Sequence, residues 1–184
     1  PTAALQQILA TIENHFSISS EAEITIETNP DDLTAAKISE LRKLPVNRFS
    51  IGTQSFFNED LVWMNRAHNA QEATDCIKRS QDAGFENLTI DLIYGYPLLT
   101  NEKWKTNIQT AIALQVPHLS AYSLTVEPKT ALAHAIEKGK QPSGQSIKFK
   151  YLVPLKTQGE KIPLYIICGG GGTARRFKNF VDMM

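Results

Sequence analysis

Four polar side chains recur at or near the ends of short apolar runs that are typical of β-strands. They are Glu27 in AEITIE, Gln54 in NRFSIGTQ, Asp91 in NLTIDLIYG and Thr125 after HLSAYSL. A carboxylate can accept hydrogen bonds from a ribose, and a neutral amide can both donate and accept them. If the strands are parallel, these side chains emerge at one rim of the sheet, where α/β proteins place their chemistry. The pattern predicts an enzyme core.

Three of these residues also have structural interpretations. Glu27 could bind a ribose hydroxyl, or it could cap the next helix or pair with a surface lysine. Gln54 follows Gly52, whose missing side chain allows close backbone approach, but Gln54 could equally be an ordinary turn residue. Asp91 lies between two apolar residues, where an ionised carboxylate is costly unless it faces a polar pocket or a partner. We therefore expect Asp91 to be functional, and both interpretations stay open for Glu27 and Gln54.

Arg66, in the segment MNRAH, adds a positive charge to the candidates. Its guanidinium can donate two hydrogen bonds to one carboxylate, or it can be a solvated cation at the end of a helix. The residue alone favours the solvated cation. The isolated His68 and His118, and the tyrosines Tyr94 and Tyr122, are typical of packed or solvated side chains, so we assign them no chemistry.

Composition and charge describe one folded domain of 184 residues, long enough to bury a sizeable core. The 19 acidic and 19 basic residues cancel and form no basic block, so we expect neither nucleic-acid binding nor a membrane-surface patch. No signal peptide or long apolar stretch is present, which indicates a cytoplasmic protein without a membrane span. Cys76 and Cys168 lie far apart and predict reduced thiols. Because Pro1 replaces an initiating Met, we expect a piece of a larger protein.

Hydrophobic periodicity places the candidate residues on repeated strand-helix units. Apolar residues at helical spacing predict helices over 5–16, 33–44, 70–83 and 130–138, and another through Trp104; apolar or alternating runs predict strands over 23–27, 48–52, 88–93 and 119–126. Gly84 and Gly139 are expected to end helices. The polar residues recur at intervals of about 30 residues, the size of βα units. This spacing fits a partial barrel and a doubly wound sheet equally well.

Five segments also stand in an order that resembles a known family. They are ETNPDDL, NRFSIGTQSF, NRAHNAQEA, TIDLIYGYP and LSAYSLTVEPKT. Together they resemble the oxygen-independent coproporphyrinogen III oxidases of the radical SAM family and, more closely, its haem-chaperone branch. The resemblance covers residues 1–140. It implies an α/β fold, an incomplete partial (β/α) barrel with about four βα units, in which these residues are the central and C-terminal part of a radical SAM core.

The same resemblance assigns a cofactor to the candidate residues. In the family, the residues that match Glu27, Gln54, Arg66 and Asp91 bind S-adenosylmethionine, and the stretch around Thr125 lines the same pocket. The candidate residues chosen above from their side-chain chemistry are therefore the same as the family's cofactor residues. The resemblance implies a parent protein that acts on haem or a porphyrinogen.

The resemblance further implies that this chain lacks the family's first two strands and its CxxxCxxC loop, whose thiolates hold a [4Fe-4S] cluster. Cys76 and Cys168 cannot replace three closely spaced thiolates. We therefore expect the cluster in the full-length parent only, and no radical chemistry from this chain alone. A haem chaperone is favoured for the parent; a decarboxylating coproporphyrinogen III oxidase and a generic nucleotide-binding α/β domain are the alternatives.

Residues 141–184 depart from the family pattern and are expected to form an atypical tail. The run GEKIPLYIICGGGGTA resembles the family's second strand and glycine-rich loop, out of their usual order. If this segment is a displaced strand, it pairs beside residues 23–27. A glycine-rich linker or a non-native segment is the competing interpretation.

Overall fold

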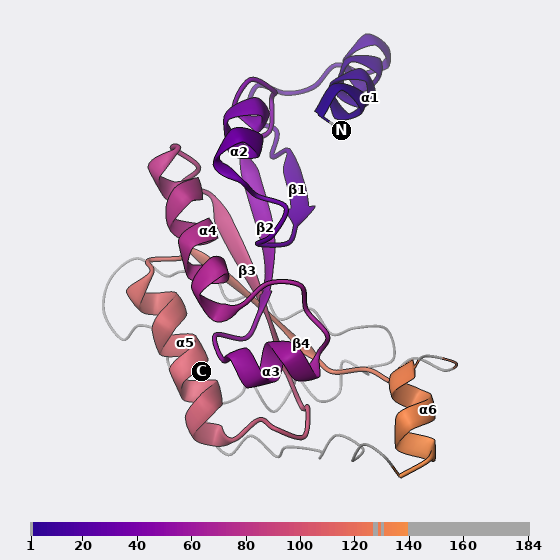
Figure 1. Cartoon of the computed structure of the whole chain (residues 1–184). Helices are drawn as coiled ribbons and strands as arrows, with labels where there is room; N and C mark the ends of the chain where they lie inside the picture. The colour runs from indigo at the N-terminus through magenta and orange to yellow at the C-terminus, as the bar shows by residue number, and fades with distance from the viewer. Residues whose placement is uncertain (1, 127–128, 130, 140–184) are drawn as a thin grey trace, which may run out of the picture.

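The computed structural model describes residues 2–126, 129 and 131–139. Within them, one parallel sheet has the strand order β1-β2-β3-β4. The strands are β1 (Thr25–Thr28), β2 (Arg48–Gln54), β3 (Leu88–Tyr94) and β4 (His118–Ser123). The helices are α1 (Thr2–His15), α2 (Ala35–Leu41), α3 (Asn58–Trp63), α4 (Ala70–Asp82), α5 (Asn101–Ala113) and α6 (Ala131–Glu137) (Figure 1). The strand-helix repetition predicted from the sequence is confirmed.

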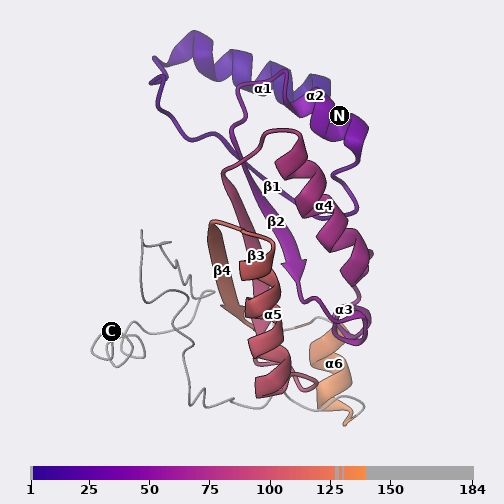
Figure 2. The same cartoon turned by 90° about the vertical axis from the view of Figure 1, so that its left-hand side faces the viewer.

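The order of the strands decides between the two architectures that spacing left open. Each strand pairs in parallel with the one before it, so the chain steps across the sheet in a single direction. A doubly wound sheet reverses direction at a switch point, whereas a (β/α) barrel does not. Helices α4 and α5 lie on the same face of the sheet (Figure 2). The described sheet therefore has the topology of a partial (β/α) barrel.

Apolar side chains of β2 and β3 form the centre of the core. Ile51, Ile90 and Leu92 are fully buried and belong to one cluster with Cys76 and Ile77 of α4. Burying each such aliphatic side chain stabilises the fold by about 1.5–3 kcal/mol. Successive side chains of a strand point to opposite faces, so the residues between these apolar ones face away from the helices.

The second face of the sheet is polar. We call it the polar face and define it by alternate residues of the four strands: Thr25, Glu27, Arg48, Ser50, Thr89, Asp91, Ser120 and Tyr122. Arg48 joins neighbouring strands at the amino end of this face, since it donates to Thr25 Oγ1 at 3.1 Å and also to Thr89 Oγ1. In a barrel, the face turned away from the helices is the interior.

Several predicted boundaries are confirmed within one or two residues, and two predicted elements end three residues early. Gly84 and Gly139 follow α4 and α6 with φ of 83° and 65°, as expected for left-handed helix ends. The predicted helix over 33–44 is shorter, because Thr34 caps α2 and α2 ends at Leu41. The strand predicted over 119–126 ends at Ser123, which leaves Thr125 beyond it.

Two further expectations concern the tail and a membrane span. The tail at 141–184, with its proposed strand beside 23–27, lies outside them. Within the described part of the chain, no helix combines the length and hydropathy that crossing a bilayer requires.

Candidate functional site

Asp91 is the centre of a row of polar side chains that runs across the polar face. The Ser50 hydroxyl of β2 lies 3.4 Å from both carboxylate oxygens of Asp91. Ser120 of β4 is paired in register with Asp91, and its hydroxyl favours the charged form of that carboxylate. Glu27 of β1 is paired in register with Ser50. Each strand thus contributes one member to the polar row, defined as Glu27, Ser50, Asp91 and Ser120.

The environment of Asp91 disfavours its charge. Burial raises the pKa of Asp91 from its ordinary value of 3.8 to about 6, and the nearby Glu27 carboxylate acts in the same direction. The hydroxyls of Ser50 and Ser120 and the more distant Arg48 oppose this rise. A half-buried carboxylate with two hydroxyl donors and a like charge beside it is incompletely compensated. Such a group is suited to a ligand that brings positive charge or hydrogen-bond donors.

Gln54 ends β2 and folds back along its own strand. A Cβ added at Gly52 would lie 2.9 Å from Gln54 Nε2 and 3.0 Å from Asn29 Oδ1. The close approach expected at Gly52 is therefore present, but the approaching groups are two side chains of this chain. Gln54 is buried and its φ is 65°, a left-handed value that is uncommon outside glycine. It is thus a turn residue, as one interpretation expected, and it is also aimed at the polar face.

The remaining predicted site residues are less enclosed. Glu27 is exposed, and it does not cap the next helix, because the Thr34 side chain occupies that position. Arg66 and Thr125 are exposed on the loops that follow α3 and β4. The structure therefore brings Glu27 and Asp91 onto one face with Gln54 at its carboxyl end. Arg66, after α3, and Thr125, after β4, lie on loops outside this group. Their ligand contacts stay predictions.

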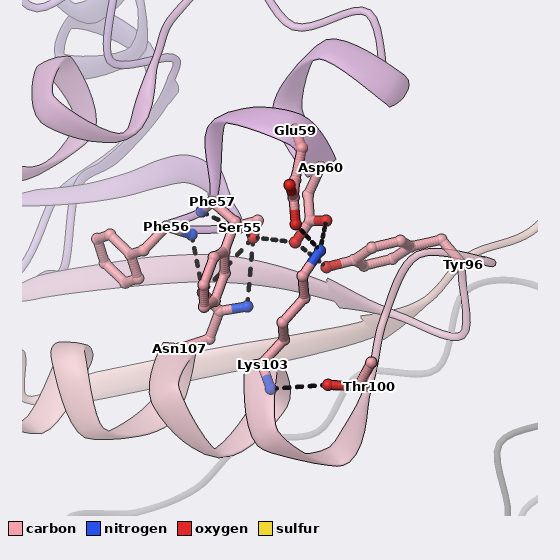
Figure 3. Close-up of polar contacts among 9 residues, drawn as sticks. All are labelled: Ser55, Phe56, Phe57, Glu59, Asp60, Tyr96, Thr100, Lys103 and Asn107. Carbon is pink, nitrogen blue, oxygen red and sulfur yellow. Dashed lines mark hydrogen bonds and ion pairs between the residues drawn. The ribbon is translucent and has the colours of Figure 1, made fainter.

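A buried network supports the loops at this end of the sheet (Figure 3). Asp60 of α3 is fully buried and accepts hydrogen bonds from Ser55 Oγ at 2.8 Å and Tyr96 Oη at 2.6 Å. Lys103 of α5 forms an ion pair with the same carboxylate at 2.8 Å and a second one with Glu59. Two hydroxyl donors and one cation compensate the burial of Asp60, so this carboxylate is structurally satisfied.

The same network extends to Asn107 of α5. Its Oδ1 accepts a hydrogen bond from the Phe56 backbone N–H at 2.8 Å, and its Nδ2 donates to Ser55 Oγ at 3.3 Å. Burial and the Asp60 carboxylate raise the pKa of Tyr96, which keeps its hydroxyl a donor. Burial alone would lower the pKa of Lys103, but Asp60 and Glu59 raise it. The loop after β2 is thereby fixed to α5 and to the loop after β3.

His68 is a residue whose structural role the sequence did not reveal. Its side chain is buried; Nε2 lies 3.2 Å from the Thr53 carbonyl oxygen, and Nδ1 lies 3.7 Å from Asp31 Oδ1. His68 is therefore packed, as expected, but it also links the end of β2 to the loop after β1. Its position two residues after Arg66 was the only sequence signal that it belongs to this region.

The described residues do not fit a [4Fe-4S] cluster. Cluster ligation requires several thiolates, and burial raises the pKa of the Cys76 thiol to about 11. In the part of the chain that the structure describes, no three His, Cys, Asp or Glu residues are grouped to hold a metal ion. S-adenosylmethionine fits better, because its sulfonium, ammonium and ribose hydroxyl groups match the half-buried Asp91 carboxylate and the exposed Glu27 carboxylate of the polar row.

Comparison with known proteins identifies the family. Residues 3–111, more than half of the chain, match the family model described as Radical SAM superfamily. The chain belongs to the radical SAM superfamily. It is 34% identical over 167 residues to the haem chaperone HemW of Bacillus subtilis, covering 89% of this chain and 44% of that protein. It is 37% identical over 127 residues to HemW of Escherichia coli, covering 69% and 34%.

A solved structure supports the same family. Coproporphyrinogen III oxidase HemN of Escherichia coli, a radical SAM enzyme, superposes with a TM-score of 0.66 at 26% identity, over 78% of this chain and 33% of that chain. Elp3 of Methanocaldococcus infernus, at 24% identity and a TM-score of 0.59, shows the fold alone.

These comparisons confirm the expected resemblance, including its haem-chaperone branch, and the α/β partial barrel. Radical SAM proteins use S-adenosylmethionine and a [4Fe-4S] cluster, so the expected cofactors are confirmed for the family. The chain spans less than half the length of the curated HemW relatives it matches here.

Proposed function

We propose that this chain forms the S-adenosylmethionine-binding part of a radical SAM haem chaperone. The observation that supports the proposal most strongly is the polar row, in which Asp91 and Glu27 face the same side of a sheet whose helices cover the other side. A satisfied structural carboxylate would have more donors than Asp91 has. The family match supports S-adenosylmethionine as the ligand of these residues.

The proposed contacts follow from the chemistry of the groups. Glu27 and Asp91 accept hydrogen bonds from the ribose hydroxyls or the ammonium group, while Gln54 binds the adenosine or the carboxylate through its amide. Arg66 donates to the carboxylate of the methionine moiety, and Thr125 lines the pocket. In a complete radical SAM protein, the bound cofactor supplies a carbon-centred radical after reduction by the cluster.

The parent's role in haem transfer is part of the same proposal. The HemW relatives favour a cytoplasmic protein that binds haem and passes it to an acceptor. The likeness to HemN favours a second candidate, a decarboxylating coproporphyrinogen III oxidase. Anaerobic incubation of the reconstituted full-length protein with coproporphyrinogen III distinguishes them. The chaperone forms no protoporphyrinogen and, when haem is supplied, retains haem stoichiometrically. The oxidase forms protoporphyrinogen.

The cofactor assignment is tested on this chain by calorimetric titration with S-adenosylmethionine. Asp91→Ala is expected to weaken binding about tenfold or more, because a charge-assisted hydrogen bond is worth about 1.5–3 kcal/mol. Asp82→Ala removes an exposed carboxylate at the end of α4 and serves as the matched control. Equal affinity of the wild type and Asp91→Ala would reject the site. ATP binding as tight as S-adenosylmethionine binding would instead favour a generic nucleotide-binding domain.

A further inference from the structure

The backbone at Gln54 forms an uncommon turn. Ser55 donates its backbone N–H to the Thr53 carbonyl oxygen at 2.8 Å, so a single residue separates the donor from the acceptor. That residue, Gln54, has a φ of 65°. A γ-turn with positive φ at its centre is the rarer and more strained kind. Strain of this type persists only where the surroundings impose it, and it concentrates at functional sites.

The turn accommodates one additional residue in β2. Between Ile51 and Gln54 the chain takes three steps, while the paired residues Ile90 and Leu92 of β3 are two steps apart. At this irregular end of β2 the Gln54 side chain folds back, and its amide lies over Gly52, on the polar face. The irregularity between Ile51 and Gln54 sets this end of β2 apart from the regular strand before it.

His68 fixes the acceptor side of this turn. Its Nε2 lies 3.2 Å from the Thr53 carbonyl oxygen that also accepts the turn's own hydrogen bond. Because a carbonyl oxygen can only accept, Nε2 carries the hydrogen. The other ring nitrogen faces Asp31 in the loop after β1. The ring therefore holds the turn against the segment that follows Glu27.

Ser55 fixes the donor side of the turn. Its hydroxyl donates to the buried Asp60 carboxylate at 2.8 Å, and the next backbone N–H, that of Phe56, donates to Asn107 at 2.8 Å. Asp60 is itself held by Lys103 (Figure 3). Residues from α3, α5 and the loop before α4 thus hold a single strained residue from both sides.

We infer that His68 and Ser55 are positioning residues that hold the strained turn at Gln54 and thereby present its amide to S-adenosylmethionine. The inference rests on the proposed function, because it takes Gln54 to be a cofactor contact. Neither residue touches the cofactor; each acts through the turn. The existence of the turn and its dependence on the two residues can be measured without the ligand.

The first measurement is hydrogen exchange of the Ser55 amide by NMR, corrected for the intrinsic rate of each variant. His68→Leu and Ser55→Ala are expected to accelerate exchange about tenfold, because each removes one support of the turn. His68→Gln keeps an N–H at the position of Nε2 and should restore protection. Ser80→Ala removes an equally buried hydroxyl in α4 and is the control. Unchanged exchange in Ser55→Ala overturns the inference even if His68→Leu does not fold.

The second measurement is thermal unfolding of paired variants. Gln54→Gly should melt about 2–4 °C above Gln54→Ala, since glycine adopts a positive φ without strain. At the ordinary strand position Thr25 the order should reverse, with Thr25→Ala melting higher than Thr25→Gly. If alanine is as stable as glycine at position 54, the turn is not strained and the inference fails.

The third measurement is the affinity for S-adenosylmethionine. His68→Leu and Ser55→Ala should weaken binding about fivefold to tenfold, and His68→Gln should remain within about twofold of the wild type. If Gln54→Ala weakens binding and these two variants do not, the positioning role is rejected while the proposed function stands. If the wild type binds no S-adenosylmethionine although exchange and melting follow expectation, the proposed function fails and the strained, supported turn remains established.

Discussion

Asp60 is a fully buried carboxylate and Asp91 is a half-buried one, and their surroundings differ. Asp60 accepts from Ser55 and Tyr96 and pairs with Lys103. Asp91 has two serine hydroxyls, one of them at the long distance of 3.4 Å, and the Glu27 charge nearby. A buried charge with its donors in place contributes to the fold, whereas one without them destabilises the fold until a ligand arrives. On our proposal, the comparison separates a structural acid, Asp60, from a ligand-binding one, Asp91.

The largest expected effect comes from Asp60. Asp60→Asn leaves the Lys103 ammonium without its buried partner and should reduce the free energy of unfolding by about 3–5 kcal/mol. Urea denaturation monitored by circular dichroism measures this loss. The double variant Asp60→Asn/Lys103→Met should recover part of it, because it removes the uncompensated cation. If the double variant loses as much stability as the sum of the losses of Asp60→Asn and Lys103→Met, the ion pair between Asp60 and Lys103 is contradicted.

Asp91→Asn should raise the free energy of unfolding, whereas Asp60→Asn lowers it. The folded chain keeps the Asp91 proton up to about pH 6, while an ordinary carboxyl releases it near 3.8. The free energy of unfolding of the wild type therefore falls as the pH rises from 3.8 to about 6. The Asp91→Asn variant does not lose this stability, because its side chain has no proton to release. We expect Asp91→Asn to be more stable than the wild type by about 2 kcal/mol at pH of about 7.5, with little difference at about pH 4.

Urea denaturation at both pH values tests this prediction, with the exposed Asp82→Asn as the control. The same Asp91→Asn variant should bind S-adenosylmethionine poorly. A variant that loses stability at the higher pH would show that Asp91 is a structural acid like Asp60.

Ser50→Ala should have the smallest effect and should sharpen the comparison. Removing this hydroxyl raises the pKa of Asp91 further, because the hydroxyl favours the charged form. The free energy of unfolding should change by less than about 1 kcal/mol, since a contact of this length is weak. An NMR titration of the Asp91 carboxyl carbon measures the shift. A lowered pKa would remove Ser50 from the polar row.

The sequence predicted the features that depend on local pattern. Periodicity gave the order of strands and helices, and the apolar neighbours of Asp91 indicated a carboxylate that needs an explanation. Ser50 could have been found as well, because it lies two residues before Gly52 and four before Gln54 on the same strand. The sequence alone did not distinguish a barrel from a doubly wound sheet, because both use βα units of the same size.

The supporting contacts could not be predicted in the same way. Asp60 meets Tyr96 and Lys103 across 36 and 43 positions of sequence, and no local pattern connects them. From the sequence alone, Asp60 is an ordinary acidic residue in the first turn of a helix. Gln54 was recognised as a candidate, but its positive φ follows from tertiary contacts. The ligand contacts of Arg66 and Thr125 stay predictions, since they depend on a cofactor.

The supports of the turn at Gln54 also bear on the order in which the chain folds. His68 lies 15 positions after Thr53, and Asn107 lies 52 positions after Ser55. Contacts that close long loops form late, because the loss of chain entropy precedes the gain. On the ribosome, β1 and β2 can pair before α5 has been synthesised, yet the turn lacks one of its supports until then. The nascent chain should therefore pair its first strands before the turn at Gln54 is fully supported, and on our proposal it gains affinity for the cofactor only afterwards.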